Sequence, residues 1–234
     1  MRLSDDLPFE VVRHPAARRV KLALDPATGR ARLIVPRRAA LGTAIAWARG
    51  KAEWLENQRA ALPAAVPFAD GTSLSVADAA LVIRWREGAS RLLRREGDLL
   101  VASGPYDTLP RRVEAWLRRE ALALLTAETA EFATLAGVEV SKVAVGDPRG
   151  RWGSCAHDGA IRYSWRLILA PGWVRRATVA HEVAHRVHMN HSPAFHALVA
   201  RLLGHDPTPA RAWLRAHGAA LHWVGRSSPD RSGT

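Results

Sequence analysis

The stretch Val179–Ser192 reads VAHEVAHRVHMNHS and places four histidines and one glutamate within eleven residues. These residues are His181, Glu182, His185, His188 and His191. On a helix, two histidines four residues apart project from one face, and this spacing lets two imidazole rings bind one tetrahedral Zn²⁺. The glutamate after the first histidine lies beside the metal, where it can take a proton from a metal-activated water. The stretch therefore predicts a hydrolytic zinc site with His181 and His185 as ligands and Glu182 as the general base.

A catalytic zinc usually has three protein ligands, so a third ligand is expected beyond His185. No glutamate follows Glu182 in the chain. Of the two later aspartates, Asp206 precedes a proline in a predicted turn and Asp230 lies in a predicted tail. An acidic third ligand is therefore excluded, and the remaining histidines are the candidates.

His188 and His191 compete for the third position. His188 shares the helical face, but on a regular helix it would lie about 10.5 Å from His181 along the axis. His191 can reach the metal if the helix ends first and the chain turns back. Asn190, which tolerates a helix-ending left-handed conformation, and Ser192 as the next N-cap both favour that turn. We predict His191 as the third ligand. The histidines after His191 lack ligand spacing and are predicted on the surface; they are His196, His205, His217 and His222.

Apolar periodicity predicts the elements that precede this helix. Residues 9–36 carry alternating apolar runs around the turn DPATGR, which favours a β-hairpin, and residues 41–60 have helical spacing. Residues 63–70 are rich in proline and small residues and are the best candidate for a boundary. Residues 72–102 contain short strands, and a long amphipathic helix begins near Pro110 and ends at Gly137.

The segment next to the histidines is predicted as a strand at 142–147, a loop at 148–159 and a strand at 160–170. The helix with the histidine cluster then begins near Trp173. Two further helices are expected, at residues 192–204 and 208–221. We therefore predict an α+β fold in four parts. These parts are an N-terminal hairpin-helix region (1–70), a β-rich segment (71–105), a metal-binding catalytic domain (106–222) and a disordered tail (223–234).

Composition limits the class of protein. Of 234 residues, 48% are hydrophobic and 24% charged, as in globular domains, and no apolar run approaches the roughly 18–20 residues of a membrane span. Cys155 is the only cysteine, which excludes internal disulfides and thiolate zinc sites and favours a reducing cytoplasm. The net charge of +12 is compatible with a nucleic-acid partner. Only three of the 34 basic residues are lysines, however, which favours a compositional origin for the charge.

Motifs around the histidines resemble the YgjP-like metallopeptidase domain family, whose distant relatives are the SprT-like and Wss-like zincin proteases. The motifs are RWGSC (151–155), SWRLILAP (164–171), HEVAH (181–185) and NHSPAF (190–195), with ARRVKLALDPATGRARLIVP and WLENQ nearer the N-terminus. The resemblance covers roughly residues 10–222 and implies a zincin-like core with an N-terminal β-rich region. It also implies that His181, His185 and His191 hold the zinc and that Glu182 is catalytic.

Some positions depart from the family pattern. Family members usually have tryptophan where His196 stands, which bears on the wall of the site and on substrate contact, and asparagine where Ser164 stands. The β-rich stretch at 72–102 also matches the family poorly. None of these departures falls on the expected ligands.

The resemblance also suggests how substrate binds. The strand at 160–170 precedes the active helix, as the edge strand does in zincins, and such an edge can pair with an extended substrate backbone. In RWGSC, Gly153 and Ser154 favour a tight turn near the metal. Arg151 either holds a carboxylate or phosphate of the substrate or braces the loop.

Three functions fit the sequence. The first is a zinc peptidase that acts on peptide substrates through the Glu182-activated water. The second is a nucleoside triphosphate pyrophosphohydrolase, an activity also associated with the family, in which Arg151 and Arg166 would hold phosphates. The third is a DNA-associated SprT-like protease, favoured by net charge alone. All three use one Zn²⁺ or another divalent metal per chain and no membrane, and the sequence does not specify an oligomeric state.

Overall fold

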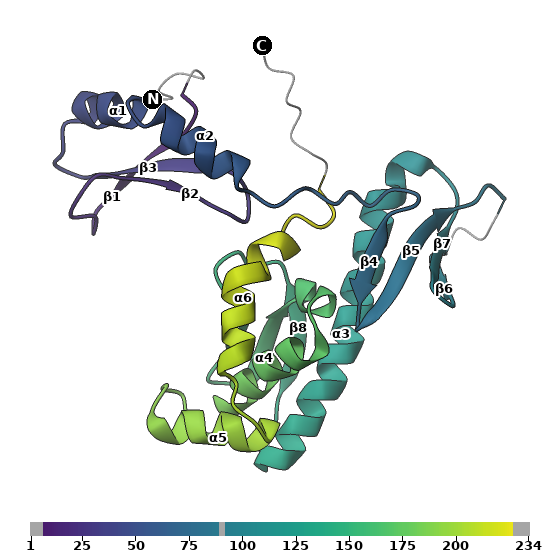
Figure 1. Cartoon of the computed structure of the whole chain (residues 1–234). Helices are drawn as coiled ribbons and strands as arrows, with labels where there is room; N and C mark the ends of the chain where they lie inside the picture. Colours follow the sequence, from purple (N-terminus) through teal and green to yellow (C-terminus); the bar gives the residue numbers. More distant parts are fainter. Residues whose placement is uncertain (1–6, 89–91, 227–234) are drawn as a thin grey trace. The chain divides into compact units, whose positions relative to one another are not determined.

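The computed structural model describes residues 7–88 and 92–226, and it has an α+β fold. The chain forms two compact units that divide between Ala64 and Ala65 (Figure 1). This division falls within the proline-containing segment 63–70. In the part of the chain that the structure describes, no helix is both long enough and apolar enough to span a membrane.

The first unit is a small sheet with two helices. Its elements are β1 (Glu10–His14), β2 (Lys21–Leu24), β3 (Ala31–Pro36), α1 (Leu41–Arg49) and α2 (Ala52–Ala60). β2 and β3 are antiparallel and form the hairpin expected around DPATGR, while β1 adds to the free side of β3 in parallel. In the turn, the Asp25 carboxylate accepts a hydrogen bond from the Ala27 N–H at 2.9 Å, and Gly29 has a φ of 69°.

The expected single helix at 41–60 is instead two helices. The first helix ends at Gly50, and Lys51 has φ −105° and ψ 19°, which redirects the chain. After this break Leu55 of α2 is buried in the same cluster as Leu33 and Val35 of β3. Because of this break, the apolar faces of α1 and α2 can both pack on the same sheet. A single straight helix over residues 41–60 could not place both faces there.

The second unit begins with a four-stranded sheet. Its strands are β4 (Ser73–Val76), β5 (Ala79–Trp85), β6 (Arg94–Glu96) and β7 (Leu99–Ala102), in the order β4-β5-β7-β6. A 3₁₀ turn, η1 (Tyr106–Thr108), leads into α3 (Leu109–Ala136). The prediction of a long helix from Pro110 to Gly137 is confirmed, and Gly137 ends α3 with a left-handed φ of 66°.

A second sheet follows α3. It consists of β8 (Lys142–Gly146), β9 (Gly153–Cys155) and β10 (Ala160–Ser164), in the order β8-β10-β9. The prediction of a strand over 160–170 is wrong beyond Ser164, because the chain turns there into the 3₁₀ helix η2 (Trp165–Leu169), whose residues are all buried. The expected loop at 148–159 contains β9, so Gly153 and Ser154 are in a strand and not in a tight turn.

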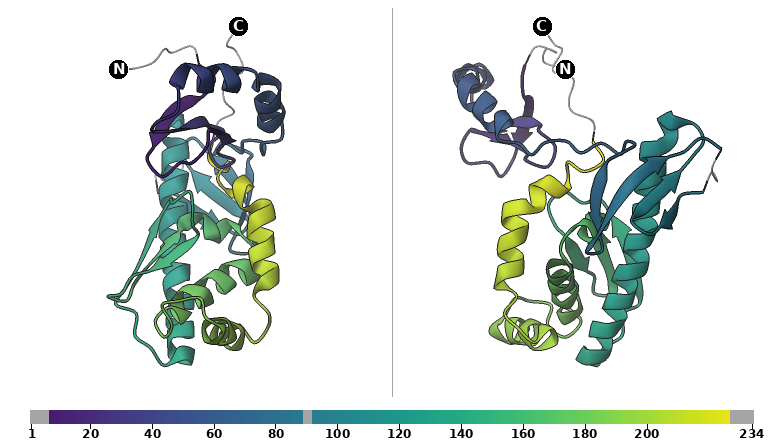
Figure 2. Two further views of the ribbon diagram at one scale, coloured as in Figure 1. Left: turned by 90° about the vertical axis from the view of Figure 1, so that its left-hand side faces the viewer. Right: turned by 45° about the vertical axis from the view of Figure 1, so that its right-hand side comes forward.

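Three helices complete the second unit. They are α4 (Gly172–Ala184), α5 (Pro193–Leu203) and α6 (Thr208–Leu221). Ser192 caps α5 as expected, because its hydroxyl accepts a hydrogen bond from the Phe195 N–H at 3.3 Å. Within this unit α4 packs between α3 and α6 and also contacts α5 and β9 (Figure 2). α4 is therefore the central helix of the unit.

The first turn of α4 is held by the β4–β5 hairpin. Ala77 and Asp78, at the hairpin tip, both have positive φ, and the Ala77 N–H donates to the Ile168 carbonyl at 2.8 Å. The Asp78 carboxylate accepts from the Gly172 N–H at 2.6 Å, so it caps α4 from 94 residues away. Acidic groups at helix N-termini are stabilising because of the helix dipole.

The two ends of the second unit are joined. Val66 forms a parallel bridge with Val224, and its backbone bonds the Trp223 carbonyl and the Gly225 N–H at 3.0 Å and 2.7 Å. The prediction that the tail is disordered from residue 223 is therefore wrong for residues 223–226, and Trp223 is buried. Residues 227–234 of that predicted tail lie outside the described residues.

Candidate metal centre

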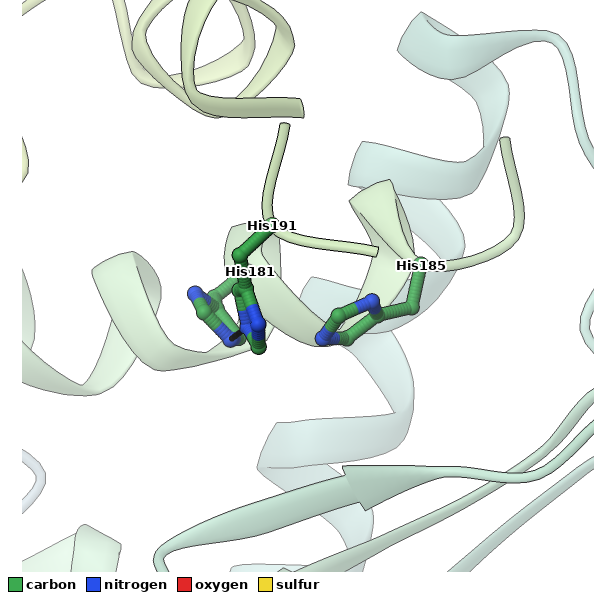
Figure 3. A group of neighbouring side chains, drawn as sticks. All are labelled: His181, His185 and His191. Atoms are coloured by element: carbon green, nitrogen blue, oxygen red, sulfur yellow. Dashed lines mark hydrogen bonds between the residues drawn. The ribbon is translucent and has the colours of Figure 1, made fainter. Parts of the chain in front are cut away.

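The structure brings His181, His185 and His191 together at the C-terminal end of α4 (Figure 3). One ring nitrogen from each lies within 4.8 Å of the others. His181 is in the last turn of α4 and His185 is its C-cap, so both come from one face of a helix. His191 lies two residues before α5 and returns to this face, with its Nε2 3.2 Å from the Nε2 of His181.

The helix ends earlier than the sequence suggests. It ends at Ala184, and Asn190 does not have the left-handed conformation expected of a helix-ending residue. The chain makes a further turn between these residues, in which the His188 N–H bonds the Ala184 carbonyl at 3.0 Å. The early end leaves enough chain for His191 to fold back beside His181.

The three nitrogens suit a tetrahedral metal. Ligand nitrogens about 2.0–2.1 Å from a zinc ion are separated from one another by about 3.4 Å. The 3.2 Å between His181 and His191 is close to this value, and all three nitrogens lie within 4.8 Å of one another. Among the described residues this is the only group of three or more His, Cys, Asp or Glu side chains close enough together to hold an ion. Three imidazoles with a fourth, open position are typical of catalytic zinc sites.

A backbone contact orients the second histidine. The Nδ1 of His185 lies 3.1 Å from the carbonyl oxygen of His188. A histidine that donates through Nδ1 presents its Nε2 as the acceptor that binds metal. His188 therefore acts on the site through its carbonyl, and its ring is outside the cluster.

Phe195 forms the floor of the cluster. Its buried ring lies 4.9, 4.5 and 4.8 Å, centroid to centroid, from the rings of His181, His185 and His191. Sequence spacing did not single out this residue, although it belongs to the motif NHSPAF. An apolar floor excludes water from one side of the three rings and limits their rotation.

Burial favours the neutral form of His181 and His185. It lowers the pKa of His181 to about 4, with smaller contributions from His185 and His191. Burial also lowers the pKa of His185, although the bond to the His188 carbonyl raises it in part. A neutral imidazole is the form that binds a metal ion, so these side chains are in the ligand state at pH 7 without the loss of a proton.

Glu182 lies against Gly153 of β9 and lines the same cavity as His181. It is buried, and burial raises its pKa to about 7, while the positive charge of Arg151 acts in the opposite direction. Its carboxylate lies so close to Gly153 that a Cβ on that glycine would be 2.6 Å from the Glu182 Cγ. A carboxylate with a pKa near the working pH is suited to accept a proton and release it again.

A cavity of about 250 Å³ opens beside Glu182 and His181. It lies between α4, α5, α6 and the residues that begin β9. Its wall is largely apolar, and the mainly apolar side chains are those of Trp152, Ala177, Val199, Pro207, Ala210 and Leu214. Arg151, His196 and Arg211 also line it. His196, expected on the surface, is thus part of the wall, as its position after NHSPAF suggested.

Two other expectations are corrected. Arg166, proposed as a phosphate ligand, is buried and forms an ion pair with Asp147 at 2.8 Å, and it also donates to the carbonyls of Leu221 and Val224. His222, expected on the surface, is buried against Trp152, with ring centroids 5.2 Å apart. Both side chains brace the end of α6. Neither is available to a substrate.

The comparisons with known proteins agree with the motifs. A family model described as YgjP-like, metallopeptidase domain, matches residues 18–217 of the chain. The match includes the three histidines, Glu182 and the residues that line the cavity. Searches of curated proteins and of solved structures return no significant match.

Proposed function

The chain belongs to the YgjP-like metallopeptidase domain family, and on that premise we propose that it is a zinc-dependent peptidase with a zincin-like core. One observation carries the proposal: three histidines converge beside a buried glutamate whose pKa is about 7. The ligand set of the proposal is His181, His185 and His191, and Glu182 is the base. The donor set fits zinc, because imidazole nitrogen is a preferred zinc ligand and a fourth position is left for water.

The residues of the chain supply the proton transfers. Bound Zn²⁺ would act as a Lewis acid toward the attacking water and the scissile carbonyl. Glu182 takes the proton of that water and then gives it to the amine nitrogen that leaves, which regenerates the carboxylate. Arg151, whose charge opposes the raised pKa of Glu182, favours the ionised form that starts the cycle. Phe195 keeps the histidine rings in place while the charge moves.

The geometry also changes the proposed substrate edge. We expected strand 160–170 to be the edge, but β10 is the central strand and β9 is at the edge. Ser154 lies opposite Arg162 of β10, and the Trp152 carbonyl accepts from the Ser164 N–H, so alternate residues of β9 bond to β10. The backbone groups of Gly153 and Cys155 therefore face the other side. An extended peptide paired there lies next to Glu182.

A second candidate is hydrolysis of a nucleoside triphosphate. Arg151 and Arg211, both exposed beside the cavity, favour an anionic group on the substrate. Arg166 cannot bind phosphate because it is held in a buried ion pair, which weakens this candidate. The largely apolar cavity wall also favours a peptide side chain over a phosphate chain. We therefore rank it second.

The test uses purified protein loaded with Zn²⁺ or Mn²⁺ and offered unfolded casein and a set of nucleoside triphosphates. Glu182→Gln should lower hydrolysis by about 10²–10⁴-fold, because the general base is lost, while bound zinc stays near one per chain. The exposed Glu139→Gln should leave hydrolysis unchanged. If Glu182→Gln retains most hydrolysis with zinc bound, the proposed mechanism is wrong.

The same preparation tests the ligand set. His191→Ala should lose zinc, and His188→Ala should retain it because its ring is outside the cluster. Zinc loss in the His188 variant alone would overturn the assignment. Nucleotide cleavage without casein cleavage would move the second candidate to first place.

A further inference from the structure

The cavity beside Glu182 has a mixed character. Six of its lining side chains are mainly apolar, and they come from α4, α5, α6, the turn before α6 and Trp152 before β9. Its polar lining outside the metal centre includes two arginines, Arg151 before β9 and Arg211 on α6. The cavity is therefore an apolar hollow with cationic groups beside it.

Neither arginine is held in an ion pair by the described residues, although the charge of Arg211 also acts on Asp206. Among the described residues, no carboxylate lies within 4 Å of either guanidinium, and both side chains are exposed. Arg211 makes one long contact, at 3.5 Å, with the hydroxyl of Thr208. Each arginine is near the reacting groups, since both line the same cavity as Glu182 and His181.

The size of the cavity limits what can enter it. Pockets that enclose drug-sized ligands are about 300–1,000 Å³, and this cavity is about 250 Å³. It has room for one large apolar side chain. A nucleoside triphosphate is too large and too polar for it, and nothing in the wall resembles a phosphate cradle of backbone N–H groups.

We infer that this pocket selects a peptide residue with an apolar side chain and a carboxylate next to it, with Val199 and Leu214 against the side chain and Arg211 and Arg151 against the carboxylate. The inference rests on the proposed peptidase function and names the substrate class. Arginine is suited to the task because its fork of N–H groups binds a carboxylate through two hydrogen bonds.

The carboxylate can come from two parts of a peptide. It can be the free C-terminal carboxylate of the bound residue, or the side chain of a neighbouring Asp or Glu. The pocket opens directly on Glu182 and His181, so a bound C-terminal residue would lie one peptide bond from the reacting groups. We therefore expect the C-terminal carboxylate to be preferred, which corresponds to removal of single apolar residues.

Binding can be measured without turnover in zinc-loaded Glu182→Gln protein. The probes are fluorescent Ala-Ala-Ala-Leu with a free C-terminus, the same peptide with a C-terminal amide, and an amidated peptide with Glu beside Leu. The free-acid peptide should bind at least about tenfold more tightly than the plain amide, as expected for one charged hydrogen-bonded pair. Adding Arg211→Gln should remove that difference. Arg215→Gln, an exposed arginine one turn further along α6 and outside the cavity, should keep it.

The three peptides distinguish a C-terminal carboxylate from a side-chain carboxylate, and they also test the inference itself. If the Glu-containing amide binds as tightly as the free acid and depends on Arg211, a side-chain carboxylate is used and the inference stands. If all three peptides bind equally, or if Arg211→Gln has no more effect than Arg215→Gln, the inference is overturned. Stronger binding of a nucleoside triphosphate at the same site would also overturn it.

A second variant tests the apolar part of the cavity wall, and it is assayed in protein that retains Glu182. In Leu214→Trp the larger side chain fills the pocket, and the fold should tolerate it because Leu214 is partly exposed. Leu214→Met is the control, because it preserves the side-chain volume. For a Leu-ending peptide, Leu214→Trp should raise KM at least fivefold with little change in kcat, while an Ala-ending peptide is less affected. Equal effects on both peptides would overturn the inference. Absence of any peptide hydrolysis would reject the proposed function, while the binding experiment would still decide on the pocket.

Discussion

Glycine is required at position 153 by the carboxylate of Glu182. A Cβ there would be 2.6 Å from the Glu182 Cγ, closer than real Cβ atoms approach. We expect Gly153→Ala to displace Glu182 and to lower hydrolysis at least tenfold, while zinc content is unchanged because no ligand moves. Gly150→Ala is the matched control, since a Cβ at Gly150 meets nothing within 4 Å. Equal activity of the two variants would show that Glu182 does not depend on this contact.

The raised pKa of Glu182 predicts a pH effect on the metal-free protein. In the folded chain its pKa is about 7, against an ordinary value of 4.5, so the folded state binds more protons between these values. Its contribution to the free energy of unfolding is therefore present at low pH and is lost as pH rises through 7. Relative to wild type, Glu182→Gln should gain roughly 3 kcal/mol between pH 4.5 and pH 8.

Urea unfolding of chelator-treated wild type and Glu182→Gln at both pH values measures this gain. The lowered pKa of His181 has the opposite sign, with stability lost on acidification from 6.5 toward 4. It is present in both proteins and so cancels in the comparison. A difference between the two proteins that does not change with pH would contradict the prediction.

At the level of single residues, spacing was enough to name the side chains that meet. His181 and His185 follow from helical periodicity, and His191 from the signals for a turn and a new helix. The contact of Gly153 with Glu182 and the role of Phe195 did not follow, because they arise from contacts between β9 or α5 and α4. A lone glycine or phenylalanine carries no periodic signal, and its neighbours are far away in the sequence.

Between elements, α4 is fixed to α3 by a buried ion pair. The Arg175 Nε donates to the Glu128 carboxylate at 3.0 Å, and Arg175 also lies 3.5 Å from Asp78. Burial raises the pKa of Glu128, and Arg175 offsets part of that effect. Removing one partner of a buried pair leaves an uncompensated charge. Glu128→Gln should therefore lower the free energy of unfolding by about 3 kcal/mol or more.

Glu131→Gln is the matched control for that change. Glu131 lies one turn further along α3 and pairs with Arg176 of α4 at 2.5 Å, but its side chain is 50% exposed. An exposed pair contributes about 0–1 kcal/mol. Urea unfolding of the two variants should separate them clearly. Equal losses would show that burial does not decide the strength of these pairs.

The element predictions were most accurate where clear end signals bounded a helix and least accurate for short strands. The 28-residue helix α3 begins and ends close to its predicted limits, since its apolar face and the final Gly137 are both strong signals. The three-residue strand β9 was predicted as loop, because three residues show no alternation. The order of β8, β10 and β9 was also missed. Whether a strand is central or at an edge depends on pairing with distant residues, which one sequence does not specify.

At the scale of the whole molecule, the positive charge is unevenly distributed. Residues 1–64 contain 12 basic and 6 acidic residues, and residues 65–234 contain 22 and 16. The shorter first unit thus carries as much excess charge as the second. The expectation of a nucleic-acid partner stays a proposal, and the dispersed arginines favour a weak, non-specific contact.

Binding to a fluorescent 20-base-pair duplex tests that proposal. We expect weak binding at 50 mM salt that falls steeply toward 200 mM, because phosphate contacts release counterions. Fluorescence anisotropy at several salt concentrations gives the slope. Tight binding at 200 mM salt, with a preference for one sequence or structure, would instead favour a DNA-associated protease.

The bridge between Val66 and Val224 holds the first and last segments of the second unit side by side, because their backbones pair directly. A circularly permuted chain, with residue 226 joined to residue 65 by a short glycine linker and a new opening in an exposed loop, should therefore preserve the metal centre. Conversely, any protein fused before residue 65 or after residue 226 would be tethered to this unit at one common point.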